Sequence, residues 1–242
     1  MSLQTLLGTE LPLLQAPMAG VQGSRLAIAV STAGGLGALP CAMLSQEAIR
    51  DEIAAIRAQT AGPYNLNFFC HSPPSADESR EAAWRSRLAD DYRAWGIDPT
   101  TIPAGPGRHP FDAAMAEFLW EFQPPVVSFH FGLPPAEWLA PLRGWGCRIL
   151  GSATTLDEAR WLQAHGVDAV IAQGLEAGGH RGMFLSDDLT QQMGTFALLP
   201  QIVAAVDLPV IAAGGIANAQ GVAAAMALGA AGVQIGTAYL LC

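Results

Sequence analysis

Short runs of apolar residues, each bounded by glycine, proline or asparagine, recur along the whole chain. The runs are apolar throughout and do not alternate with polar residues, which is typical of parallel strands covered on both faces. Between them, amphipathic patterns predict helices, for example over 45–60, 154–165 and 217–228. The predicted strands are 12–17, 35–39, 64–69, 125–130, 147–151, 168–172, 208–213 and 231–236.

The repetition of strand and helix indicates βαβ units, and hence a parallel sheet of the α/β class. Eight such units in 242 residues match a (β/α)8 TIM barrel. A doubly wound sheet would usually have fewer strands and a crossing point in their order. We therefore expect one barrel domain over residues 1–242.

Two stretches between predicted strands, 70–124 and 173–207, are too long for a loop and a single helix. Both follow the C-terminal end of a strand, on the face where barrel enzymes keep their sites. We expect 70–124 to be an insertion after the third strand, and both stretches to cover or build the pocket.

Only Thr237 to Cys242 follow the last predicted strand, which leaves no room for an eighth helix. An apolar strand flank without its helix tends to associate. We therefore expect either a homo-oligomer through the uncovered flank or a piece of a longer protein.

Composition narrows the classes of function. Hydrophobic residues make up 51% of the chain and charged residues 14%, which predicts a large buried core. The net charge of −9, with no basic run, argues against a nucleic-acid partner. No apolar run reaches the roughly 18 residues of a membrane span and no signal peptide is visible, so we expect a cytoplasmic protein without a membrane partner.

The chain has no lysine, since all 12 basic residues are arginine. This excludes Schiff-base chemistry on a lysine and a P-loop. The four cysteines are far apart in sequence and form no C-x-x-C pair, so we expect neither a zinc site nor a disulfide framework.

Glycine turns follow the last two predicted strands, at Gly214 and Gly215 and at Gln234 to Thr237. Glycine lets backbone N–H groups approach an anion closely, and barrels often bind phosphate at these two loops. The pair therefore predicts a phosphate site; the alternative is that the glycines only serve tight turns.

Other strand ends carry candidates for contact with a flat ring. Ala16, Pro17 and Met18 form a rigid apolar ledge after the first strand, which suits the edge of a flavin. Asn67 and Gln173 end the third and sixth strands and offer amides to such a ring. Core packing of Met18 and a turn role for Asn67 are the alternatives.

His130 ends the fourth strand between two phenylalanines. Desolvation there would hold its imidazole neutral, as a general base requires, and we predict a catalytic role for it. His180, in the glycine-rich segment after the sixth strand, is the rival base, although it could instead bind phosphate or rest in solvent. No metal site is predicted.

These segments together resemble the nitronate monooxygenases, formerly called 2-nitropropane dioxygenases. The match runs in order along nearly the whole chain and includes the insertion with Gly105, Pro106, Gly107 and Arg108. It is carried by residues 15–20, 65–67, 128–132, 176–182 and 214–216.

The resemblance implies an FMN-dependent oxidoreductase that oxidises alkyl nitronates with dioxygen and needs no nicotinamide cofactor. It assigns His130 to catalysis. It also assigns Ala16, Met18, Asn67 and Gln173 to the flavin ring. It places Gly178, Gly179, Gly214, Gly215, Gln234, Gly236 and Thr237 at the ribityl and phosphate end. Family members continue beyond the eighth strand with a segment that this chain does not contain.

Two alternatives remain open from the sequence. One is an FMN- and NAD(P)H-dependent reductase of the enoyl-acyl-carrier-protein reductase type, whose glycine turns are similar. The other is a truncated flavin-binding chain that has no turnover.

Overall fold

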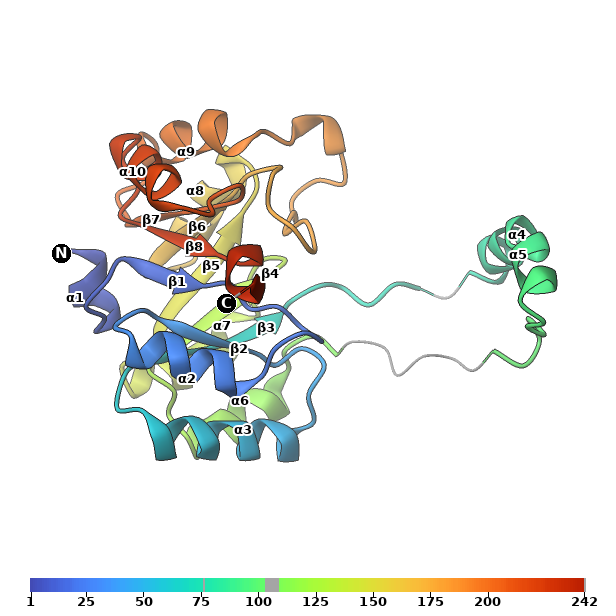
Figure 1. The fold of residues 1–242 in the computed structure, drawn as a ribbon, viewed down its shortest axis with the longest axis horizontal. Coiled ribbons are helices and arrows are strands. Elements are labelled where there is room, and N and C mark those ends of the chain that lie inside the picture. The colour runs from blue at the N-terminus through green and yellow to red at the C-terminus, as the bar shows by residue number, and fades with distance from the viewer. Residues whose placement is uncertain (76, 103–108, 242) are drawn as a thin grey trace. The chain divides into compact units, whose positions relative to one another are not determined.

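The computed structural model describes residues 1–75, 77–102 and 109–241. Eight parallel strands alternate with helices along the chain (Figure 1). The strands are β1 (Leu13–Gln15), β2 (Gly37–Pro40), β3 (Tyr64–Phe69), β4 (Val126–His130), β5 (Arg148–Ala153), β6 (Ala169–Gln173), β7 (Val210–Ala213) and β8 (Gly232–Ile235). All eight predicted strands are confirmed, with ends shifted by no more than a few residues.

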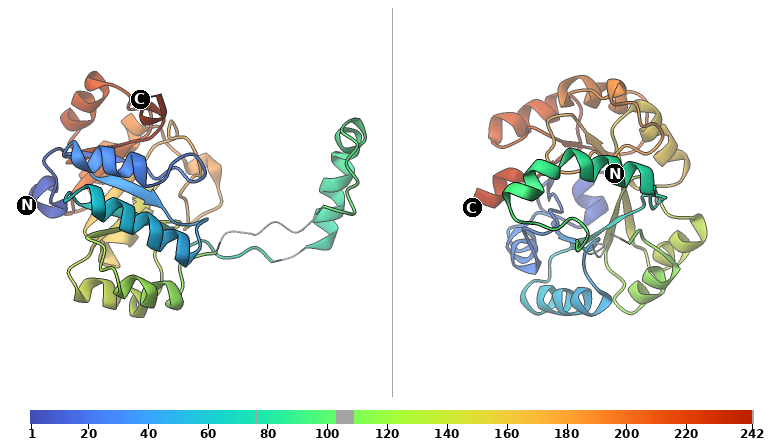
Figure 2. Two further views of the ribbon diagram at one scale, coloured as in Figure 1. Left: turned by 60° about the horizontal axis from the view of Figure 1, so that its bottom comes forward. Right: turned by 90° about the vertical axis from the view of Figure 1, so that its right-hand side faces the viewer.

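The sheet closes into a barrel. Its strand order is β1-β8-β7-β6-β5-β4-β3-β2, and a parallel bridge between Leu14 and Leu36 joins its two outer members. The backbone N–H of Leu36 donates to the carbonyl of Leu13 at 2.9 Å across this seam. The right-hand view of Figure 2 shows the helices arranged around the strands. The predicted TIM barrel is thus confirmed.

The helices of the barrel unit are α1 (Leu3–Leu7), α2 (Ser24–Thr32), α3 (Gln46–Gln59), α6 (Ala113–Trp120), α7 (Ala136–Gly144), α8 (Leu156–Ala164), α9 (Thr195–Val203) and α10 (Ala219–Ala227). The start of α3 is explained by its N-cap, because the Ser45 side chain accepts a hydrogen bond from the N–H of Ala48. Its buried Ile49, Ile53 and Ile56 fall on one face. The predicted helices over 45–60, 154–165 and 217–228 are confirmed as α3, α8 and α10.

The barrel interior is apolar at the N-terminal ends of the strands. Leu3 and Leu7 of α1 join one buried cluster with Leu14, Leu36 and other inward-facing strand residues. A Cβ added at Gly232, where β8 begins, would lie only 2.4 Å from the Cδ2 atom of Leu3. Helix α1 therefore closes this end of the barrel, and the strands' C-terminal ends remain for a site.

The structure divides the stretch predicted as one insertion. Helix α6 packs beside α7 as a barrel helix, and residues Met1–His71 and Pro110–Cys242 form one compact unit. The second unit, Ser72–His109, contains α4 (Glu78–Arg87) and α5 (Ala89–Ala94), neither of which has a buried residue. Gly105, Pro106, Gly107 and Arg108 lie outside the described residues.

Beyond β8 the described residues form a 3-10 helix, η2 (Thr237–Leu241), and no α-helix follows within them. A shorter 3-10 helix, η1 (Leu189–Gln191), precedes α9. Within the described ranges, no helix has both the length and the apolar character needed to cross a membrane.

Candidate functional site

The predicted site residues gather at the C-terminal ends of the strands. His130 and Gln173 are the last residues of β4 and β6, and Asn67 lies near the end of β3. Gly236 lies beside the loop after β1, because a Cβ added to it would be 3.4 Å from Ala16 Cβ and 3.6 Å from Met18 Sδ. Pro17 stands between these two residues, and Gln234 pairs in register with Leu14 and Ala213. One end of the barrel therefore holds all of these residues.

The turns after β7 and β8 are suited to an anion. Gly214 and Gly215 have φ of +115° and +71°, in the region that favours glycine. Within the described part of the chain, the backbone N–H groups of Gly215, Ile216, Gly236 and Thr237 take part in no hydrogen bond with the protein. Free N–H groups on neighbouring strand ends are the donors that a phosphate needs.

Nearby lie the glycines of the loop after β6. A Cβ added at Gly178 would be 3.8 Å from the hydroxyl oxygen of Thr237, and one at Gly179 would meet no atom within 4 Å. This loop therefore borders the turn after β8 and leaves room beside its backbone.

Arg181 ties the start of the loop after β6 together. Its guanidinium donates to the carbonyls of Gly174 at 2.6 Å and Ala177 at 3.2 Å, and also to those of Gln173 and Leu175. Burial lowers the pKa of Arg181, while the charge of Glu176 acts in the opposite direction. Arg181 thus holds the loop's carbonyls and is already committed within the protein.

Glu176 joins the same loop to the turn after β7. Its carboxylate accepts from the N–H of Thr195 at 2.7 Å and from the Thr195 hydroxyl at 2.9 Å. The Thr195 hydroxyl oxygen also lies 3.0 Å from the carbonyl oxygen of Gly214. Burial tends to raise the pKa of Glu176, but hydrogen bonds from its own N–H and from Thr195 outweigh this and lower it. These contacts fix the Gly214 turn.

His130 is held by the loop after β6. Its Nε2 lies 3.1 Å from the carbonyl oxygen of His180, so Nε2 carries the proton and donates. Burial lowers the pKa of His130 to about 4; the bond to His180 opposes this, and the charges of His180 and Arg181 add to it. The imidazole is neutral at pH 7, as the sequence predicts.

The other ring nitrogen of His130 faces the same loop. A Cβ at Gly182 would lie 2.6 Å from His130 Cε1 and 3.0 Å from Nδ1. Gly182 itself donates from its N–H to Oε1 of Gln173 at 2.7 Å, and Gln173 Nε2 donates to the His180 carbonyl at 2.9 Å. His130 is thus bonded to this loop through its Nε2, and Gly182 packs closely against the Nδ1 side of its ring.

His180 has the exposed ring at this site. Its ring centroid lies 5.4 Å from that of Phe69 and 5.9 Å from that of Phe131. Phe131 adopts a φ of +68°, a strained value for a bulky residue, which places its ring against His130 at 4.6 Å. The ring of His71 also contacts Phe69 at 6.2 Å and Phe131 at 6.0 Å between centroids. Three histidines and two phenylalanines therefore form one aromatic cluster at the mouth of the barrel.

Asn67 is less available than the sequence suggests. It is buried, and its Nδ2 donates to the Ser128 hydroxyl at 3.0 Å. Asn65 donates to the same hydroxyl at 2.8 Å, and its own Oδ1 is buried without a partner among the described residues. A ring contact by Asn67 stays a prediction.

Sequence reasoning missed two anchoring residues of the loop after β6. Thr195 carries no sequence signal beyond its position at the start of a helix. Glu158 does carry one, since Thr155 to Glu158 reads as the capping box of a helix. That signal predicts the start of a helix, but it does not predict the contact of Glu158 with the loop after β6.

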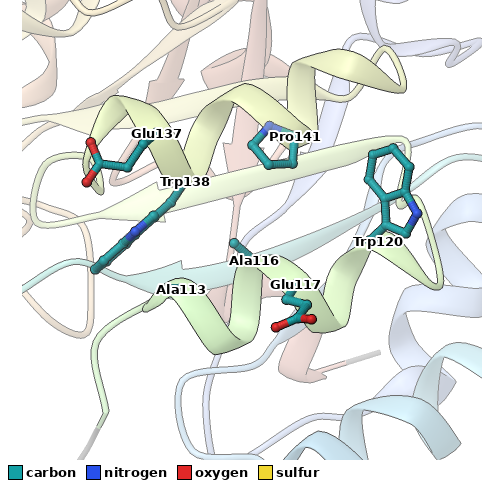
Figure 3. A pocket seen from close by; sticks show the side chains of 7 residues that line it. All are labelled: Ala113, Ala116, Glu117, Trp120, Glu137, Trp138 and Pro141. Carbon is teal, nitrogen blue, oxygen red and sulfur yellow. The ribbon is translucent and has the colours of Figure 1, made fainter.

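Within the described residues, no group of three or more His, Cys, Asp or Glu side chains is placed to hold a metal ion. Cys41, Cys70 and Cys147 are free thiols. A cavity of about 330 Å³ lies elsewhere, between α6 and α7 (Figure 3). Its lining comes only from these two helices, with Trp120, Trp138 and Pro141 as its main apolar walls, so it is separate from the strand ends.

Comparisons with known proteins give matches over the whole chain. A sequence model of the family described as nitronate monooxygenase matches residues 1–242. A nitronate monooxygenase from Paraburkholderia phytofirmans is 47% identical, over 100% of this chain and 66% of its own length. One from Pseudomonas aeruginosa is 44% identical, over 98% of this chain and 68% of its own. The chain spans about two thirds of the length of these relatives.

Two solved structures are similar as well. Nitroalkane oxidase from Streptomyces ansochromogenes superposes with a TM-score of 0.87 at 39% identity, over 99% of this chain and 68% of that one. FabK from Thermotoga maritima superposes with a TM-score of 0.73 at 31% identity, over 99% of this chain and 62% of that one.

Proposed function

The chain belongs to the nitronate monooxygenase family, and from this premise we propose that it oxidises alkyl nitronates with dioxygen on a bound FMN. The observation that carries the proposal is the cluster of neutral His130, exposed His180 and free backbone N–H groups at one end of the barrel. It combines a place for a flavin phosphate with a place for a proton acceptor. The Streptomyces nitroalkane oxidase at 39% identity supports the same chemistry.

The donors at the strand ends fit FMN. The free N–H groups after β7 and β8 suit one phosphate, and the glycines there carry no side chain that would take up its space. FMN would supply the two-electron redox chemistry between nitronate and dioxygen. We propose Ala16, Pro17, Met18, Asn67 and Gln173 for the ring, and Gly178, Gly179, Gly214, Gly215, Gln234, Gly236 and Thr237 for the ribityl and phosphate end.

The two histidines have different tasks in this proposal. The Nε2–H of His130 donates to the carbonyl of His180, so His130 holds the His180 backbone in place. The exposed ring of His180 then accepts a proton from a nitroalkane, or orients the nitro group of a nitronate. That His130 itself is the base remains the prediction from sequence, and substitution of each histidine combined with amide exchange of the loop separates the two assignments.

A second candidate is the FMN- and NAD(P)H-dependent reductase. It is favoured by the similarity to FabK and, for the fold alone, to an enoyl reductase domain at 15% identity. The nitroalkane oxidase superposes more closely and at higher identity, so the oxidase is preferred.

An absorption spectrum and an oxygen electrode test the function. The purified chain should show a flavin spectrum, release FMN on denaturation and consume dioxygen with preformed alkyl nitronate. Release of FAD would contradict the cofactor assignment. Anaerobic bleaching by NADH without nitronate turnover would favour the reductase. A flavin spectrum without oxygen uptake would support the third hypothesis, a truncated flavin-binding chain without turnover, and a colourless chain would contradict FMN binding itself.

We also propose a cytoplasmic location and self-association. Three thiols without a disulfide among the described residues support a reducing, cytoplasmic location. Association of two copies through the flank beside β8 stays a prediction, to be checked by sedimentation.

A further inference from the structure

A buried carboxylate holds one segment of the loop after β6, residues 180–185, which we call the 180–185 limb. Glu158, at the start of α8, is 1% exposed. Its Oε1 accepts from the backbone N–H groups of Phe184 at 2.6 Å and Leu185 at 3.3 Å. Its Oε2 accepts from the N–H of Thr154 at 2.7 Å and the Thr154 hydroxyl at 2.8 Å. One side chain therefore bridges the end of β5 and the loop after β6.

All four partners of Glu158 are donors, so both of its oxygens must act as acceptors. An ionised carboxylate meets this requirement, whereas an amide offers one acceptor and one donor. Glu158 stands at the position where the side chain of a capping box reaches back to its own helix start. Here Thr155 still caps α8, but one oxygen of Glu158 is turned to another loop.

The 180–185 limb, which Glu158 anchors, includes His180 and contacts His130. Gly182 packs on His130, and only one residue separates it from Phe184. The Phe184 ring contacts Trp161 of α8 at 5.1 Å and lies beside Gly132, the second residue after β4. Gln173 accepts from the N–H of Gly182, and Glu158 accepts from the N–H of Phe184, so the two side chains hold the 180–185 limb at two points.

We propose that Glu158 is a positioning residue of the active site, which fixes the 180–185 limb so that His130 and His180 keep their places. The proposal rests on the proposed function for its kinetic consequence, but not for its consequence on loop order. Glu176 and Thr195 hold the phosphate turn separately, so Glu158 should affect turnover more than flavin binding.

The test compares FMN-loaded Glu158→Gln with wild type and with Asp157→Asn. Asp157 is the adjacent residue of the same helix, its side chain is 83% exposed, and its ion partner is Arg160. The control therefore removes the same charge without touching the loop. Amide exchange over residues 180–185, FMN affinity, and kcat and KM for preformed nitronate are measured for all three proteins.

In Glu158→Gln we expect exchange in 180–185 to accelerate about 10-fold or more and kcat to fall roughly 10- to 100-fold, the scale for lost supporting hydrogen bonds. FMN affinity should stay within about 3-fold of wild type, because the phosphate turn is independently held. Glu158→Asp keeps the charge but is too short to reach both ends, so it should also loosen the limb. Asp157→Asn should match wild type in every readout.

If Glu158→Gln does not fold, Thr154→Val keeps the carboxylate and removes one of its donors, and should show the same changes to a smaller degree. Unchanged exchange in 180–185, or a loss of FMN affinity equal to the loss of kcat, would overturn the proposal. A wild-type chain that does not oxidise nitronate would overturn the proposed function, whereas faster exchange in the variant would still show that Glu158 orders the limb.

Discussion

The Nε2 atom of His130 lies 3.1 Å from the backbone carbonyl oxygen of His180, so the partly buried histidine holds the main chain of the exposed one. This relationship makes the two residues separable by mutation. His180 is exposed, whereas His130 bonds to the loop through Nε2 and packs against Gly182.

His180→Asn should lower turnover of a neutral nitroalkane roughly 100-fold, the usual scale for a positioned acid or base. The fold and flavin spectrum should be unchanged, because the His180 carbonyl remains. Steady-state oxygen uptake measures the effect. With preformed nitronate the proton is already absent, so a smaller loss there would indicate proton transfer, and an equal loss would indicate orientation of the anion.

His130→Asn should also lower turnover by roughly 100-fold, whether His130 acts on the substrate or through the loop. Amide exchange across 178–185 distinguishes these routes. Faster exchange together with slower turnover supports positioning, whereas slower turnover with an unchanged loop supports direct catalysis. Near-normal activity in this variant would exclude both roles.

Acid should destabilise the protein partly through His130. The pKa of His130 in the folded protein is about 4, below the ordinary value near 6.5. Between pH 4 and 6.5 the imidazole is therefore protonated in the unfolded chain and neutral in the folded one. Stability therefore falls as pH drops from about 6.5 to 4, by up to about 3 kcal/mol from this group. Urea unfolding at several pH values should give a smaller decline for His130→Gln, and identical declines would show that His130 is not the cause.

Gly215→Leu should reduce flavin occupancy, since a side chain there would enter the space of the phosphate and would lie 3.2 Å from Cβ of Glu176. Gly146→Leu is the matched control. Gly146 also has positive φ, +84°, but open surroundings, and it lies before β5, at the opposite ends of the strands. Both variants carry backbone strain of about 1 kcal/mol or more. Equal FMN content in the two purified proteins would argue against a phosphate at Gly215.

Gly37→Ala should destabilise the barrel by about 3 kcal/mol or more, because the added Cβ would lie 2.0 Å from the carbonyl oxygen of Ala27 in α2. Gly144→Ala, at the end of α7 with no atom within 4 Å, should be neutral or stabilise by up to about 1 kcal/mol. Thermal unfolding of the two variants measures this contrast. Comparable melting temperatures would show that α2 can move away from β2.

How much the sequence reveals differs between the strands and the site. The eight strands could be predicted because a strand buried on both faces is mostly apolar along its length, as in Val210 to Ala213 of β7. The glycines after β7 were readable because only glycine readily adopts a φ of +115°. The boundary of the insertion could not be predicted, since 70–124 contains both the Ser72–His109 unit and the barrel helix α6. Only the packing of α6 against α7 shows that α6 belongs to the barrel.

The sequence by itself determined the barrel, its glycine turns and the neutral state expected of His130, because burial and backbone freedom depend on residue type and local order. Only the tertiary structure decided which atoms each polar group meets. It turned His130 toward the backbone of His180, 50 residues away, and Glu158 toward Phe184, 26 residues away. A hydrogen bond needs its two atoms within about 3 Å, and the closure of the barrel brings such distant residues together.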